Sequence, residues 1–144
     1  MFNHVDLSID PLDRETIDGV RYYDVPDVEG FTKLVSITSV TSWINREIFR
    51  EWRAKVGNQL ADKITKAATS RGTDMHTLTE NYLLNKDLPT VQPLSEFLFK
   101  QSKTKLDLID NIHAIEKPLY SLKLGVAGTV DCIAEYEGEL AVID

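Results

Sequence analysis

Three short segments of the sequence carry side chains suited to metal binding or acid–base chemistry. The first is RGTDMHTLTENYL, in which His76 and Glu80 are four residues apart and therefore project from one face of a helix. Such a pair can point into a cleft together. A histidine near a helix start is also commonly a capping or packing residue, so this motif alone leaves both interpretations open.

The second segment is IEKPLYS, which places Glu116 on an apolar-flanked strand two residues before Pro118. A carboxylate in this setting is either retained for chemistry or simply exposed to solvent. Strand alternation puts Glu116 on the same side as Pro118 and Tyr120, opposite Ile115, which keeps the exposed interpretation open.

The third segment, GVAGTVDCIAEYEGELAVID, is the most specific. Asp131 lies inside the apolar run VAGTVDCIA, and Asp144 ends the apolar run LAVID. Aspartate has low strand propensity and an unpaired buried carboxylate is costly, so two such placements on adjacent strands require a compensating cation. Mg²⁺ or Mn²⁺ fits, because each prefers carboxylate oxygens and leaves positions for a phosphate oxygen. The alternative is that both carboxylates pair with Lys or Arg or are exposed.

Several helices followed by strands must position these residues. Apolar spacing predicts a helix that starts at a Ser39 or Thr41 cap and ends at Gly57. We expect a second helix from Asn58 to Ala68, followed by a break at Arg71-Gly72. A third helix over DMHTLTENYLLN and a fourth ending near residue 110 are expected after it. Most aromatic residues of the first helix are expected in the core, because they recur at helical spacing.

Alternating polarity then predicts strands over His113 to Leu124, VAGTVDCIAEY and ELAVID, with a tight turn at Glu137-Gly138. Residues 1–30 are expected to be an irregular arm with a short strand from Val20 to Val25. Residues 31–144 are expected to be one domain, helical over 39–110 and β over 112–144. The predicted fold class is therefore α+β, with N-terminal helices followed by a mostly antiparallel meander.

The composition sets limits on the class of protein. The 144 residues are 42 % hydrophobic and 27 % charged, which is typical of a single globular domain. The sole cysteine, Cys132, excludes an internal disulfide and a cysteine-held cluster. No apolar run reaches about 18 residues and the N-terminus is acidic, so we expect a cytoplasmic protein without a membrane partner.

The charge of −7 is unevenly distributed. Residues 31–71 hold eight basic and three acidic residues, a local charge of +5 that could steer an anionic ligand or merely solvate a helix face. Trp43, Phe49 and Trp52 alternate with arginines there and could stack on unpaired bases. The candidate nucleic-acid-binding residues are Arg46, Arg50, Arg53, Lys55, Lys63, Lys66 and Arg71.

Five segments, taken in order, resemble the PD-(D/E)xK nuclease superfamily: ITSVTSW, RGTDMHTLTENYL, IEKPLYS, GVAGTVDCIA and GELAVID. Within that superfamily they resemble the RecB-like exonucleases, which include the mitochondrial genome maintenance exonuclease and phage relatives. The resemblance spans residue 34 to the last residue. It implies a restriction-endonuclease-like fold in which His76, Asp131 and Asp144 hold Mg²⁺ or Mn²⁺, with Glu80 and Glu116 in flanking motif positions.

The resemblance also implies a catalytic set of His76, Glu116, Asp131 and Asp144 that hydrolyses DNA phosphodiesters, on single-stranded ends, in phage replication or recombination. The helices between Ser39 and Asn85 would form the arch under which a single strand passes.

The family's second carboxylate is followed, two residues on, by a lysine that orients the attacking water. That position lies outside the printed sequence, so we expect a truncated, inactive N-terminal portion whose core sheet is incomplete at its C-terminus. We also expect the exposed last strand to invite self-association. A non-catalytic nucleic-acid-binding or assembly module with a nuclease-like fold is the alternative function.

Overall fold

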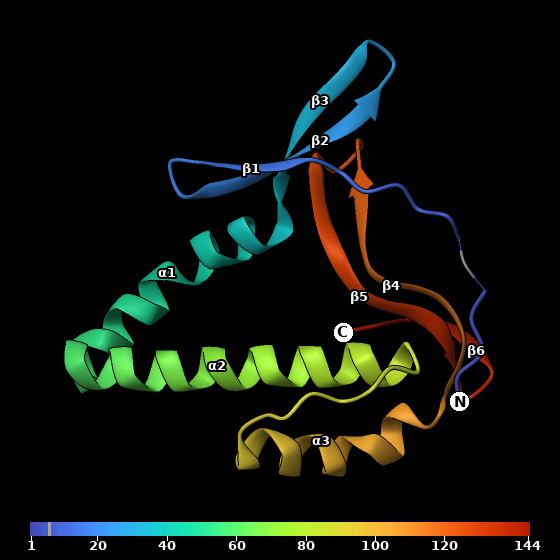
Figure 1. The fold of residues 1–144 in the computed structure, drawn as a ribbon. Helices are drawn as coiled ribbons and strands as arrows, with labels where there is room; N and C mark the ends of the chain where they lie inside the picture. The colour runs from blue at the N-terminus through green and yellow to red at the C-terminus, as the bar shows by residue number, and fades with distance from the viewer. Residues whose placement is uncertain (6) are drawn as a thin grey trace.

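A computed structural model describes residues 1–5 and 7–144 of the chain, which fold into helices and one mixed sheet (Figure 1). The predicted α+β class is confirmed. In chain order the elements are β1 (Arg14–Ile17), β2 (Val20–Asp27), β3 (Gly30–Ser36), α1 (Ile37–Val56), α2 (Asn58–Leu83), α3 (Pro93–Leu106), β4 (Ile109–Ser121), β5 (Val126–Tyr136) and β6 (Glu139–Ile143).

The first thirty residues are not the irregular arm that the sequence predicted. Strands β1 and β2 form a hairpin whose turn residues Asp18 and Gly19 both have left-handed backbones, with φ of 50° and 79°. An Asp-Gly pair is the preferred chemistry for such a turn. Every residue of β1 is exposed, so this strand lacks the apolar alternation by which a strand is recognised in sequence.

The sheet has the order β1-β2-β3-β5-β4, and β6 pairs with β5. The antiparallel meander of β4, β5 and β6 is confirmed, including the turn at Glu137-Gly138. The prediction that helices come first is wrong, because β1 to β3 precede them. Strand β3 joins β5 in parallel through Val35 and Ser36, which brings the N-terminal hairpins into the same sheet.

The helices differ from the predicted set in their boundaries. Helix α1 begins after Ser36, rather than at Ser39 or Thr41, and α2 runs without a break through Arg71 and Gly72. One interior glycine costs a helix only about 1 kcal/mol, which is too little to end it. Helix α3 ends at Leu106, and β4 starts four residues before the predicted strand.

Figure 1 shows α1 descending from the sheet to the start of α2, which returns toward β4, β5 and β6 with α3 alongside. The end of α2 is anchored in a core cluster formed by Leu83, Ile109, Ile112, Cys132 and Ala134. A second cluster joins the hairpins to β5 through Tyr23, Val25, Leu34 and Ala127. The first cluster holds the end of α2 to β4 and β5, and the second holds the hairpins to β5.

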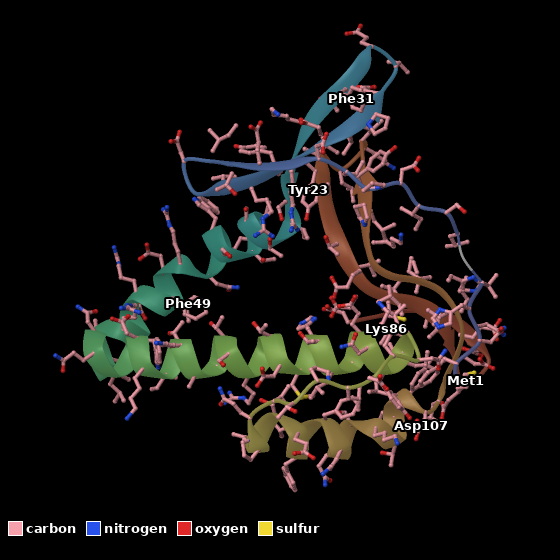
Figure 2. All side chains as sticks on the ribbon, viewed as in Figure 1. Met1, Tyr23, Phe31, Phe49, Lys86 and Asp107 are labelled. Atoms are coloured by element: carbon pink, nitrogen blue, oxygen red, sulfur yellow. The ribbon has the colours of Figure 1, made fainter. Side chains whose placement is uncertain are left out.

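Helix α1 contains no buried residue, so the prediction that most of its aromatic residues are core is wrong. Trp43 and Phe49 are 65 % and 59 % exposed, and Figure 2 labels Phe49 on α1. Helical periodicity groups side chains on one face, but it does not specify whether another element covers that face. None of the helices within residues 1–5 and 7–144 combines the length and hydropathy needed to cross a bilayer.

Candidate metal centre

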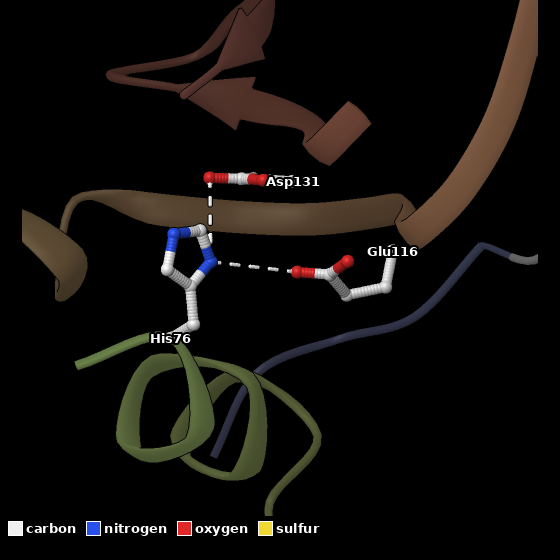
Figure 3. Close-up of side chains that lie close together, drawn as sticks. All are labelled: His76, Glu116 and Asp131. Carbon is white, nitrogen blue, oxygen red and sulfur yellow. Dashed lines mark ion pairs between the residues drawn. The ribbon is translucent and has the colours of Figure 1, made fainter. Parts of the chain in front are cut away.

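Three of the predicted site residues meet where the C-terminal half of α2 faces the sheet. His76 projects from α2, Glu116 from β4 and Asp131 from β5 (Figure 3). The Nδ1 atom of His76 lies 3.6 Å from Oε1 of Glu116 and 3.7 Å from Oδ2 of Asp131. Each residue offers one ligand atom, and these three atoms lie within 4.8 Å of one another.

Sheet register explains why the carboxylates meet. Ile115 pairs with Cys132 and Lys117 pairs with Val130, so the residues between them, Glu116 and Asp131, lie opposite each other.

On the other side of β5, Cys132 pairs with Ile143, which places Asp144 opposite Asp131 in the continuing register. Directly opposed residues share a face of the sheet. Glu116, Asp131 and Asp144 therefore form a row across β4, β5 and β6.

The backbone at Glu116 is irregular. Its φ is 50°, in the left-handed region that side-chain-bearing residues seldom occupy inside a strand. Such a conformation costs of order 1 to 2 kcal/mol, and strain of this kind is concentrated at functional sites. The sequence argument assumed a regular strand at Glu116, and this left-handed φ is a local departure from one.

The cluster opens into a cavity of about 250 Å³ between α2, α3 and the three C-terminal strands. Glu80, one helical turn after His76, lines this cavity, and so does Asp144. The four predicted catalytic residues therefore share one cavity. Sequence reasoning missed Thr79 and Ser102, which also line it and carry no distinguishing motif.

The carboxylates of the cluster lie close together and have few cationic partners. Burial raises the pKa of the Asp131 carboxyl, the charge of Asp144 and hydrogen bonding with it add to the rise, and His76 opposes it. Within the described residues, no Lys or Arg forms an ion pair with Glu116, Asp131 or Asp144. Among those residues, His76 is the sole ion-pair partner of Glu116 and Asp131, and no ion pair is formed by Asp144.

The three side chains are of types that a divalent metal can take as ligands, but His76 and Glu116 are exposed, and exposed acidic groups are common without an ion. Imidazole nitrogen and carboxylate oxygens together suit Mn²⁺, and carboxylates with water suit Mg²⁺. Ligand bonds of about 2.1 Å put neighbouring ligand atoms about 3 Å apart and opposite ones about 4.2 Å apart. The separations of 3.6 and 3.7 Å from His76 lie within that range.

The seven predicted nucleic-acid-binding residues lie elsewhere. Arg46, Arg50, Arg53 and Lys55 are on α1, Lys63, Lys66 and Arg71 are on α2, and none of them lines the cavity.

Several of these cations already have partners. Arg46 stacks on Trp43 at 5.2 Å and Arg50 pairs with Glu47 at 2.6 Å. Arg53 pairs with Asp62 at 2.6 Å, a contact that bridges α1 and α2. The structure therefore brings His76, Glu116 and Asp131 together, leaves Asp144 outside this group of potential ligand atoms, and places the basic residues on a separate helical surface.

Comparison with protein families and with curated proteins found no match for this sequence. A functional argument for the chain therefore rests on its residues and their geometry.

Proposed function

We propose that this chain is the metal-binding portion of a Mg²⁺- or Mn²⁺-dependent DNA exonuclease with a restriction-endonuclease-like fold. The observation that carries the proposal is the convergence of His76, Glu116, Asp131 and Asp144 from one helix and three strands on one cavity. A bound divalent cation supplies Lewis-acid polarisation of a phosphate oxygen and lowers the pKa of its water.

The residues of this chain have different roles in the proposed reaction. His76, Asp131 and Asp144 hold the ion, and Glu116 is placed to accept a proton or to complete the ligand set. The basic residues of α1 and α2 bind phosphates, with Trp43 and Phe49 exposed for stacking on unpaired bases, so single-stranded ends are the proposed substrate. The helical surface thus binds DNA, and the cavity receives the scissile phosphate.

The metal site is tested by Mn²⁺ titration calorimetry on the wild-type chain and on Asp131→Asn. The substitution keeps the shape of the side chain and removes one anionic ligand, so we expect Mn²⁺ affinity to fall by at least about tenfold. Asp87→Asn is the matched control, because Asp87 is exposed and outside the cavity. Equal Mn²⁺ affinity in wild type and Asp131→Asn would contradict the proposal.

The reaction is tested with end-labelled single-stranded DNA in Mn²⁺. The resemblance places a lysine two positions after Asp144, so the assay is run on the printed chain and on any longer natural chain that contains it. Cleavage by the longer chain, lost in Asp131→Asn, supports the exonuclease. A residue other than lysine at that position, together with no cleavage, would weaken it seriously.

One observation favours a second function, a nucleic-acid-binding or assembly module without turnover. None of the residues that line the cavity is Lys or Arg, so the described part of the site lacks a cation to stabilise charge on a reacting phosphate. Salt-sensitive binding of a short single strand, unchanged by Asp131→Asn and without cleavage in Mn²⁺, distinguishes this function.

Self-association through β6 is a separate proposal about partners. The outward side chains Leu140 and Val142 are 72 % and 69 % exposed on an edge strand. Edge strands with exposed apolar residues pair readily with other chains. Sedimentation of the wild type and of Val142→Lys tests it, and a monomeric wild type would refute it.

A further inference from the structure

The N-terminal strap, residues 1–5, lies along β4 beside the end of α2. The backbone N–H of Val5 donates to the carbonyl of Ile112 at 2.7 Å, and the N–H of Ile112 donates to the carbonyl of Asn3 at 2.8 Å. Figure 1 places the N-terminus near the end of α2. The strap therefore adds a short backbone pairing to β4, the strand that carries Glu116.

Asn85 fastens the strap to the end of α2. Its side-chain amide donates to the Phe2 carbonyl at 3.0 Å and accepts from the Phe2 N–H at 2.8 Å. The Phe2 ring packs edge-on against Tyr82 with centroids 5.1 Å apart. His4 adds a bond from Nε2–H to the carbonyl of Leu83 at 2.9 Å. The last turn of α2 is thus held to the strap by side chains from both segments.

These contacts act on the helix that carries His76. The buried residues of α2 are Ala61, Leu78 and Leu83, and Ser95 of α3 donates to Asp74 at 2.7 Å, so packing and α3 hold the middle of the helix while the strap holds its end. Leu83 lies seven residues after His76, which is about 10 Å along the helix. Ile112, to which the strap bonds, lies four residues before Glu116 on β4. The strap therefore joins the helix of one metal ligand to the strand of another.

We propose that Asn85 is a positioning residue for the cluster of His76, Glu116 and Asp131, acting through the N-terminal strap. The inference rests on the proposed function, because it assigns Asn85 a part in holding metal ligands at coordination distance. Asn85 does not touch the cavity. It fixes where the end of α2 lies relative to β4.

The backbone of Asn85 allows a sharp test. Its φ is 57°, which Gly adopts without strain, so Asn85→Gly removes the amide and keeps the helix end. Asn85→Asp keeps the acceptor for the Phe2 N–H and loses the donor to the Phe2 carbonyl. Asn45→Ala, on the exposed face of α1, is the control.

Three measurements are made on each variant: Mn²⁺ affinity by calorimetry, the NMR resonances of the His76 ring, and amide hydrogen exchange over the end of α2. We expect Asn85→Gly to weaken Mn²⁺ binding about tenfold, to shift the His76 ring resonances and to speed exchange about tenfold. Asn85→Asp should be intermediate and Asn45→Ala unchanged.

Faster exchange in Asn85→Gly with unchanged Mn²⁺ affinity and unchanged His76 resonances would overturn the proposal, since the strap would then be structural only. A wild type that binds no Mn²⁺, with His76 resonances that still move in Asn85→Gly, would refute the proposed function and leave the positioning role supported. If Asn85→Gly does not fold, Phe2→Ala provides the same three readouts by removing the strap's ring contact with Tyr82.

Discussion

Adding Mn²⁺ to the chain at a hundred times its dissociation constant should raise the free energy of unfolding by about 2.7 kcal/mol. The stabilisation follows from linkage, because the cluster of His76, Glu116, Asp131 and Asp144 is assembled from a helix and three strands that separate on unfolding. For a chain of 144 residues this corresponds to a rise in Tm of about 8 °C.

The Asp131→Asn variant should differ from the wild type in its stability without metal and in its response to Mn²⁺. Without metal it should be at least as stable as the wild type, because burial and the nearby Asp144 raise the pKa of Asp131 and so disfavour its charged form. With Mn²⁺ it should gain little, because one anionic ligand is gone. Asp87→Asn should show the full wild-type shift.

Differential scanning calorimetry in EDTA and in Mn²⁺ measures both quantities. Two results would refute the reasoning. One is a wild-type Tm that stays the same at every Mn²⁺ concentration at which the protein remains in solution. The other is an equal Mn²⁺-induced rise in wild type and Asp131→Asn, since the ion would then bind elsewhere.

Three further predictions concern stability. Because the pKa of Asp131 is raised in the folded chain, Asp131 keeps its proton to higher pH there than in the unfolded chain. The protonated Asp131 therefore adds to the free energy of unfolding at low pH. This contribution is complete below the ordinary value of 3.8 and is lost as pH rises through the folded pKa. Urea titrations against pH should show this contribution in wild type and not in Asp131→Asn. Because Glu116 has a φ of 50°, Glu116→Val should be about 1 to 2 kcal/mol less stable than Glu116→Gly. In a regular strand the valine variant would be the more stable one. Equal urea midpoints for the two variants would contradict the left-handed backbone. Gly72→Ala should stabilise the chain by about 1 kcal/mol, because Gly72 is inside α2 and a Cβ there meets nothing within 4 Å; a lower Tm would show that the helix is interrupted.

The grouping of the candidate site residues was predictable in part from the sequence, because some of its signals are local; that these residues bind a metal stays a prediction. Asp131 and Asp144 stand out in apolar strands whose turn at Glu137-Gly138 fixes their register, and register alone places them opposite each other. Placing His76 beside these carboxylates requires a further condition, which is that α2 returns to the sheet. The apolar cluster around Leu83 meets that condition through contacts between residues distant in sequence.

The parts that sequence reasoning missed depend on tertiary contacts or on exposure. Strand β1 is wholly exposed and has no apolar pattern, so its pairing with β2 is evident only in the structure. Trp43 and Phe49 follow a helical period but remain uncovered. The left-handed backbone of Glu116 has no signature in sequence, because glutamate is not a residue type that favours it.

The separation of basic surface and cavity along α2 leads to a last prediction about substrate length. Lys66 lies ten residues before His76, which is about 15 Å along the helix axis and about 80° around it. A nucleic-acid strand advances about 3.4 Å per nucleotide in duplex geometry, so at that rise a phosphate at the cavity and one at Lys66 are about four nucleotides apart. Under the proposed exonuclease function, Lys66→Ala should therefore raise KM severalfold for an eight-nucleotide single strand and leave a dinucleotide unaffected, with kcat unchanged for both. Steady-state cleavage in Mn²⁺ by a chain competent for turnover measures these constants. An equal effect of Lys66→Ala on both substrates would show that Lys66 acts on the cavity or on folding rather than by binding a distant phosphate.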